Sequence, residues 1–166
     1  MTLLDAPVFD AARARRKQTI IYSAIGLFFV LFIGDWLVSG MPVDWPWNWW
    51  THLRGRTTAN HFLDAVEQND LAKAFGIWVH DPGWQQHEAN YRDYPFARFQ
   101  QDWSPTSSGN DYGAIKSHKI LAARISGNTL VLGISINGLK SKALFLAYDP
   151  KMHTLGFSPV ELYLGP

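Results

Sequence analysis

The feature that most constrains this chain is the apolar run from Thr19 to Val38, TIIYSAIGLFFVLFIGDWLV. No charged side chain lies between Lys17 and Asp35. An α-helix rises about 1.5 Å per residue, so about 20 such residues cross the ~30 Å hydrocarbon core of a bilayer. We therefore expect residues 19–38 to form a single transmembrane helix.

A cleaved secretory signal is the alternative interpretation of the same run. Basic residues precede it, and Val38-Ser39-Gly40 is a tolerable small-residue cleavage site. The apolar run is longer than the usual core of a signal peptide, however, and this favours an anchor that stays in the protein.

The charges on the two sides of the run predict its orientation. Four basic residues lie between positions 13 and 17, whereas positions 39–54 hold a single Lys or Arg, Arg54. The positive-inside rule then places the N-terminus in the cytoplasm and the C-terminal domain outside. In a bacterium, this corresponds to the inner membrane with the C-terminal domain in the periplasm.

Aromatic residues mark both the span and the segment after it. Four of the eight tryptophans follow directly on the span: Trp45, Trp47, Trp49 and Trp50. Indole rings favour the membrane interface, so an outer aromatic belt is expected there. A contact surface for a protein or a pigment is the alternative, because four indoles within six positions exceed what anchoring requires. A similar surface, facing lipid or a partner, is offered within the span by Phe28, Phe29 and Phe32.

Composition limits what the remaining chain can be. Removing the tail, the span and a linker leaves roughly 110 to 125 residues, which is enough for one domain with its own core. The net charge is +1, with 15 basic and 14 acidic residues, so no overall field favours nucleic acid. The absence of cysteine excludes disulfides and thiolate metal sites.

Three helical patterns open this domain. Thr57 or Thr58 can cap the first helix, and Asn69 can cap the second. Pro95 begins the third, in the segment YPFARFQQDW. Apolar residues recur every three or four positions in each pattern, so each helix is expected to bury one face.

From Ala114 onward the apolar period changes to two, which is typical of strands. We expect strands at 114–125, 129–137, 142–148 and 153–158, joined by tight turns. Short turns between consecutive strands predict an antiparallel meander.

The predicted fold class is therefore α+β, with about three helices packed on an antiparallel curved sheet behind one transmembrane helix. The predicted segments are a cytoplasmic basic tail (1–18), the transmembrane helix (19–38), an interfacial Trp-rich linker (39–56), an α+β domain (57–159) and a C-terminal tail (160–166).

The order of these elements resembles the nuclear transport factor two-like superfamily. The resemblance is carried by the stretches HFLDAVEQNDLAKAFGIW, YPFARFQQDW and AIKSHKILAARISGNTLVL, and it covers residues 57 to about 159. It implies a cone-shaped α+β domain, a fold that hosts isomerases, dehydratases, binding modules and interaction domains. Through GIWVHDPGWQQH and YPFARFQQDW, the chain also resembles small membrane-anchored acidobacterial proteins of unknown function.

The resemblance implies a pocket inside the cone, where isomerases of this superfamily place a carboxylate base opposite a tyrosine. The residues in the corresponding part of this chain are Tyr91, Asp93, Tyr94, Trp103 and Tyr112. They lie on and beside a loop, and the strands supply mostly apolar residues. The catalytic roles therefore do not map onto named residues, and we expect no catalytic site.

Other chemistry has weak support in the sequence. The densest group of metal-ligand residue types comprises His80, Asp81, His87 and Glu88. Their spacing fits no zinc motif or calcium loop, so we expect a polar turn in which His80 and Asp81 bond to the backbone, and no metal. We expect His61 and His118 to be structural or exposed. No GxSxG, GxGxxG or P-loop motif occurs.

These observations predict a non-catalytic, single-span accessory subunit that stabilises or docks partners in a larger membrane complex. The expected partners are membrane lipids and other subunits, and an electron-transfer complex, photosynthetic or respiratory, is the class that we predict. No cofactor is expected, because the span has no histidine to ligate haem or chlorophyll, and lipid or pigment would contact it by packing. The alternative is a membrane-anchored periplasmic cone that binds a small ligand or acts as an isomerase or dehydratase.

Overall fold

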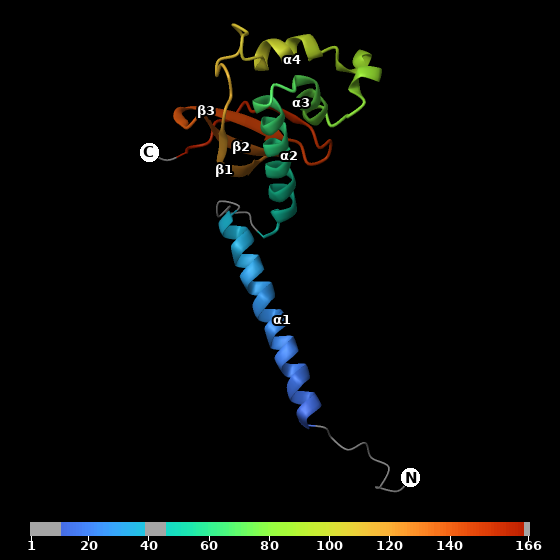
Figure 1. Ribbon diagram of the computed structural model, residues 1–166, viewed down its shortest axis with the longest axis vertical. Coiled ribbons are helices and arrows are strands. Elements are labelled where there is room, and N and C mark those ends of the chain that lie inside the picture. The colour runs from blue at the N-terminus through green and yellow to red at the C-terminus, as the bar shows by residue number, and fades with distance from the viewer. Residues whose placement is uncertain (1–10, 39–45, 165–166) are drawn as a thin grey trace. The chain divides into compact units, whose positions relative to one another are not determined.

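The computed structural model describes residues 11–38 and 46–164 (Figure 1). The chain divides into two compact units, Met1–Val38 and Ser39–Pro166, and each is described by itself. The predicted tail up to residue 10, residues 39–45 of the predicted linker and the last two residues lie outside the described residues.

The described part of the first unit is one helix, α1 (Ala11–Val38), of 28 residues. It is long and apolar enough to cross a membrane, and none of its residues is buried. It begins at Ala11 and not at Thr19, so the expected start of the helix was wrong. The run AARARRKQ contains good helix formers and no breaker, and the hydroxyl of Thr19 donates to the carbonyl of Arg15 at 3.1 Å. The basic residues before the apolar run are therefore helical.

The second unit opens with helix α2 (Trp49–Glu67). This start was also predicted too late, because Thr57 and Thr58 lie inside the helix and do not cap it. No proline follows Pro46 in this segment, so nothing interrupts the helix before the two threonines. Eight of the 18 residues that we predicted as a linker, 49–56, are thus helical.

Helices α3 (Leu71–Trp78) and α4 (Phe96–Trp103) follow, as the sequence predicted. The predicted cap of α3 was wrong by one position: the side chain of Asp70 accepts from the backbone N–H of Lys73 at 3.1 Å. Asn69 instead adopts a left-handed conformation, with φ of 55°, directly after α2. Two short 3-10 helices, Trp84–Gln86 and Glu88–Tyr91, lie between α3 and α4.

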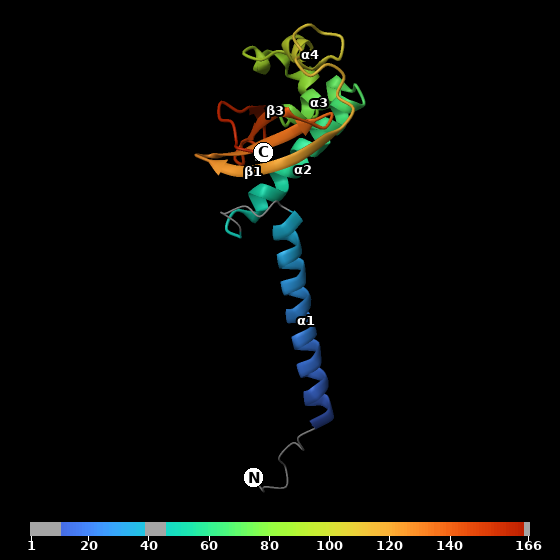
Figure 2. The same ribbon diagram turned by 90° about the vertical axis from the view of Figure 1, so that its left-hand side faces the viewer.

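The sheet is the predicted antiparallel meander, with strand order β1-β2-β3-β4 (Figures 1 and 2). Its strands are β1 (His118–Ser126), β2 (Thr129–Ile136), β3 (Leu139–Tyr148) and β4 (Leu155–Phe157). β1 begins four residues later than expected, at His118 and not at Ala114. Asn137 and Gly138, with φ of 52° and 76°, form the turn between β2 and β3, because both residue types tolerate positive φ.

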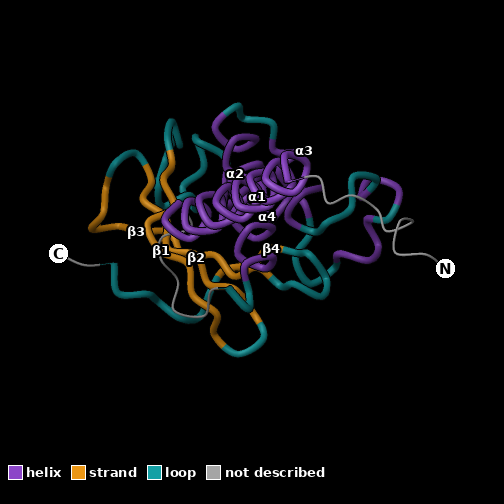
Figure 3. The backbone as a smooth tube through the Cα atoms, turned by 90° about the horizontal axis from the view of Figure 1, so that it is seen from below, coloured by secondary structure: helices purple, strands orange, loops and turns teal. Residues whose placement is uncertain are grey.

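The helices and the strands form separate layers within the second unit (Figure 3). α2 packs against β1, β2 and β3. The contact is closest at Gly55, where a Cβ atom would come within 2.6 Å of Leu130 and 3.0 Å of Tyr148. A residue without a side chain at this position lets the helix approach the sheet.

Aromatic rings fill the space between the layers. The ring of Phe62 lies 4.9 Å from Trp103, 5.2 Å from Trp78 and 6.1 Å from Phe99, measured between ring centroids. Trp103 also stacks on Phe157 at 5.7 Å with an angle of 5° between the ring planes. These aromatic side chains at the centre of the domain are therefore closely packed.

Both faces of β2 are buried. The side chains predicted to face the core are all buried, namely Leu130, Leu132, Ile134 and Ile136. On the opposite face, Val131 and Ser135 are buried as well. A Cβ atom on Gly133 would come within 2.6 Å of Leu164, so the C-terminal segment lies over this face of the sheet.

Candidate functional site

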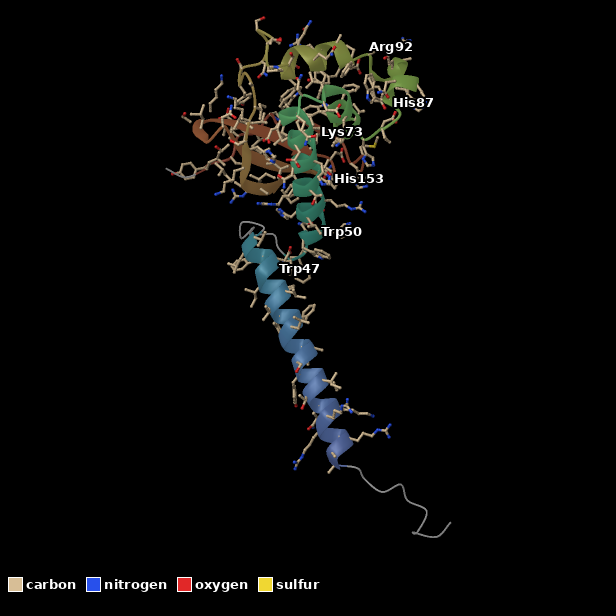
Figure 4. The ribbon with its side chains drawn as sticks, in the orientation of Figure 1. Trp47, Trp50, Lys73, His87, Arg92 and His153 are labelled. Atoms are coloured by element: carbon tan, nitrogen blue, oxygen red, sulfur yellow. The ribbon has the colours of Figure 1, made fainter. Side chains whose placement is uncertain are left out.

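Three tryptophans at the start of α2 form an exposed aromatic surface, which we call the tryptophan surface (Trp47, Trp49 and Trp50; Figure 4). Their exposed fractions are 89%, 45% and 50%. The rings of Trp49 and Trp50 lie 5.3 Å apart, and the guanidinium carbon of Arg54 lies 4.8 Å from the ring of Trp50. The fourth predicted tryptophan, Trp45, lies outside the described residues.

The phenylalanines predicted to contact lipid or a partner cluster on α1. Phe28 and Phe29 are exposed, and Phe32 is partly exposed. The ring of Phe28 lies 5.9 Å from Phe29 and 5.7 Å from Phe32. They form one aromatic group on a helix that has no buried residue.

Four of the five residues predicted to line a pocket lie around one hollow of about 570 Å³, which we call the tyrosine pocket. These residues are Asp93, Tyr94, Trp103 and Tyr112. Arg98, Asp102, Asp111 and Phe157 also line it. Because Trp103 and Phe157 stack on each other, the pocket ends at the aromatic core and does not enter the space between the helices and the sheet.

The polar groups of the tyrosine pocket already bind one another. The phenol of Tyr94 donates to Oδ2 of Asp102 at 2.8 Å, and Nε of Arg98 lies 3.4 Å from Oδ1 of the same carboxylate. Burial first, and then the hydrogen bond to Asp102, raises the pKa of Tyr94 well above its usual range. The phenol is therefore neutral near pH 7 and its proton is engaged.

The indole nitrogen of Trp103 is the exception in this pocket. It is buried and has no hydrogen-bond partner of standard geometry among the described residues. It lies close enough to the Tyr94 phenol to lower the pKa of that group, against the larger effect of burial. A buried donor without a good acceptor is costly, so a ligand oxygen that accepted from it would gain more binding free energy than one at a donor that is already paired.

Tyr91, the fifth predicted pocket residue, lies elsewhere. Its phenol donates to Oδ2 of Asp81 at 2.8 Å, and its ring packs against Phe75 at 5.7 Å. The same carboxylate oxygen lies 2.9 Å from Nδ1 of His87, and Oδ1 accepts from the N–H of Gly83 at 2.8 Å. The hydrogen bond from His87, followed by that from Tyr91, lowers the pKa of Asp81.

The predicted polar turn is thus confirmed for Asp81, which bonds to the backbone of Gly83. His80 does not take part in it. Its ring instead lies 5.3 Å from the ring of His153, which is far away in sequence.

His118, which we expected to be structural or exposed, has contacts with two residues of α2. Nδ1 of His118 lies 2.6 Å from Oε1 of Glu67, and Nε2 lies 3.2 Å from Oδ1 of Asn60. Among the described residues, Asp64, Glu67 and His118 form a group whose possible metal-ligand atoms all lie within 4.8 Å of one another. The 3.6-residue period of a helix places Asn60, Asp64 and Glu67 on one face, and this was the signal available in the sequence.

A further group of polar residues was missed. Arg54, His80, His153 and two threonines surround a hollow of about 450 Å³ beside the tryptophan surface. Nη1 of Arg54 lies 3.3 Å from Nε2 of His153, and Nδ1 of His153 lies 2.8 Å from the phenol oxygen of Tyr148. These residues come from α2, from the turn after α3 and from the segment before β4, so no local motif joins them.

No family model matches this chain, and neither a curated protein nor a solved structure matches it. Function therefore has to be inferred from the residues and their geometry.

Proposed function

We propose that this protein is a single-span membrane protein whose C-terminal domain is a non-catalytic docking module for other subunits of a membrane complex. The observation that carries the proposal is the tryptophan surface. Trp47 is 89% exposed, whereas Phe62 and Phe99 in the core of the same domain are at 0% exposure. Exposed indoles are costly in water and are enriched in interfaces, where they act as anchors.

The position of this surface in the chain supports an interface at the membrane. Ten residues separate Val38, the end of α1, from Trp49, the start of α2. The tryptophans therefore follow the apolar helix closely in the sequence, through a connection of at most about 40 Å at ~3.6 Å per residue. Indoles prefer the zone between hydrocarbon and water, where a partner subunit and lipid headgroups meet.

We further propose that α1 is a retained anchor in a bacterial inner membrane, with the domain in the periplasm and a cone-like α+β fold of the nuclear transport factor two-like type. The basic residues at the start of α1 and the order of helices and strands support these two statements. An electron-transfer complex remains our prediction for the class of assembly.

The experiment is co-purification of the full-length chain from native membranes in mild detergent. We expect W47A/W49A/W50A to leave the complex while the protein stays in the membrane through α1. The matched control is L139A/M152A/V160A, which removes exposed apolar side chains, 57%, 66% and 43% exposed, elsewhere on the domain. Unchanged partners in the tryptophan variant would overturn the proposal.

A second candidate function is binding of a small ligand in the tyrosine pocket. It is favoured by the buried indole N–H of Trp103 at a hollow of about 570 Å³. The internal bonds of Tyr94 and Asp102 argue against proton transfer there, so we infer binding and not isomerase chemistry. Fluorescence or NMR titration with a ligand library, compared with W103F, would detect such a site.

A further inference from the structure

The hollow beside the tryptophan surface is lined by basic and polar side chains and by no carboxylate. We call it the histidine pocket; it is lined by Leu53, Arg54, Thr57, Thr58, His80, Tyr148 and His153. A neighbouring hollow of about 640 Å³ shares Thr58 and His80 with it and adds His61 and Lys73. Neither lining contains a carboxylate, whereas three aspartates line the tyrosine pocket.

The acids next to pocket residues in the chain are Asp81, after His80, and Asp149, after Tyr148, and both accept hydrogen bonds. Oδ1 of Asp149 accepts from the backbone N–H groups of Lys151 and Met152, at 2.7 and 3.1 Å. These bonds lower the pKa of Asp149, and the nearby His153 lowers it further. The lining of the histidine pocket itself combines cationic, imidazole and hydroxyl groups with no carboxylate, which is the chemistry of an anion site.

The hydrogen bonds of His153 orient its ring. A guanidinium can only donate, so Nε2 of His153 accepts from Arg54 and the proton lies on Nδ1, which donates to Tyr148. Tyr148 is buried at 1% exposure and fixes the far side of the ring. The near side, with Nε2 and the guanidinium, faces the hollow.

Two turns bring the imidazoles together. His80 and His153 both adopt left-handed backbone conformations, with φ of 55° and 60°, and their rings lie 5.3 Å apart. Such conformations are uncommon for residues other than glycine and cost free energy. The two histidines thus come from separate turns and line the same pocket. His153 is labelled in Figure 4.

The neighbours of Arg54 identify the source of the anion. Arg54 lies one helical turn after Trp50 and packs over its ring at 4.8 Å. Trp50 and Leu53 are 50% and 41% exposed on the same helix. Apolar side chains beside a cationic pocket match an amphiphile, with acyl chains next to a phosphate, better than they match a free phosphate ion.

We propose that Arg54 and His80 bind the phosphate of an anionic phospholipid headgroup, with Thr57 as a further donor; His153, whose ring proton is donated to Tyr148, lines the site without donating to the phosphate. Arg54 would donate both arms of its guanidinium to phosphate oxygens, which replaces its weak 3.3 Å bond to His153. This site rests on the anchoring by α1 proposed above.

The test uses the full-length chain in nanodiscs of phosphatidylcholine with and without phosphatidylglycerol. Native mass spectrometry then measures how much phosphatidylglycerol stays bound to the protein after the protein is released from the nanodisc. R54Q/H80N removes the charge and one imidazole, and asparagine tolerates the left-handed backbone at position 80. We expect retention to fall about tenfold, as for the loss of charge-assisted hydrogen bonds. R124Q, which removes an exposed arginine from β1, should retain the lipid as the wild type does.

A second measurement identifies the ligand and is independent of folding defects. In wild-type protein, phosphatidylglycerol should shift the imidazole NMR signals of His80 and His153 but leave unchanged that of His118, which contacts Glu67 and lines neither hollow. Equal shifts from inorganic phosphate in pure phosphatidylcholine discs would overturn the lipid assignment. Either of two results would overturn the site: R54Q/H80N retains as much phosphatidylglycerol as the wild type, or R124Q loses as much of it as R54Q/H80N does. Failure of the wild type to enter the discs would instead overturn the anchor.

Discussion

The carboxylate of Glu67 lies 2.6 Å from Nδ1 of His118, and this contact joins the end of α2 to the first residue of β1. The two side chains are 23% and 12% exposed, so the pair is largely shielded from water. Nε2 of His118 lies 3.2 Å from Oδ1 of Asn60 and is held by it. The pair thus fixes where the sheet begins relative to the helix that covers it.

The first prediction concerns this pair. H118A should lower the free energy of unfolding by about 1–2 kcal/mol, because it removes a charge-assisted hydrogen bond and leaves Glu67 partly buried without it. Urea unfolding of the full-length chain in detergent, followed by tryptophan fluorescence, measures the loss.

The control for this prediction is H61A. His61 is an exposed histidine on the same helix, and its removal should change the free energy of unfolding by less than about 0.5 kcal/mol. Equal stability of H118A and H61A would show that the contact between α2 and β1 contributes nothing measurable.

The second prediction concerns the pH dependence of Asp81. Its pKa lies below its usual value of 3.8 in the folded protein, chiefly because of the hydrogen bonds from His87 and Tyr91. The unfolded chain therefore binds this proton more readily, so the stabilisation by Asp81 is present above pH 3.8 and is lost as the pH falls through the lower, folded-state pKa.

Thermal unfolding of the wild type and D81N from acidic to neutral pH measures this effect. The wild type should be more stable at neutral pH, and the difference in melting temperature should shrink as the pH falls below 3.8. D93N removes an exposed carboxylate from the same connection and is the control for a change of net charge. A difference that stays constant across this range would contradict the assignment.

The fold was predictable where a local pattern determines the structure. The alternation from Leu130 to Ile136 identified β2, and the tight turns expected between consecutive strands identified the meander, because both signals lie within a few residues. Asn137, expected as the last residue of that strand, belongs to the turn. The start of α2 was not predictable in this way. Thr57 and Thr58 are good capping residues, but a helix that begins upstream leaves them no free N–H groups to cap.

The candidate sites show the same difference between contacts that are local in sequence and contacts that are not. Tyr94 precedes α4, Trp103 is its last residue, and both line the tyrosine pocket, as the sequence grouped them. Tyr91 lies only three positions before Tyr94, but its phenol donates to Asp81 and it does not line the tyrosine pocket. The histidine pocket joins Arg54 to residues that follow in later elements, and such a contact exists only once the chain has folded.

The third prediction concerns orientation. The helix α1 carries Arg13, Arg15, Arg16 and Lys17 before its apolar part and no basic residue in its last turn. Because basic residues stay on the cytoplasmic side, we expect the C-terminal domain to be exported. Alkaline phosphatase fused after Pro166 should be active, and protease added to spheroplasts should digest the domain.

The charge itself can be tested in the same assay. Replacement of all four basic residues by glutamine should reduce phosphatase activity and protease access, because the positive-inside bias is then lost. The matched control replaces the four basic residues Lys116, Lys119, Arg124 and Lys142, which lie far from the span in sequence, by glutamine and should leave orientation unchanged. If the domain of the wild-type protein were protected from the added protease, the tryptophan surface and the histidine pocket would lie in the cytoplasm, where anionic headgroups are equally present. The headgroup site would then survive, and only the assignment of the domain to the periplasm would be wrong.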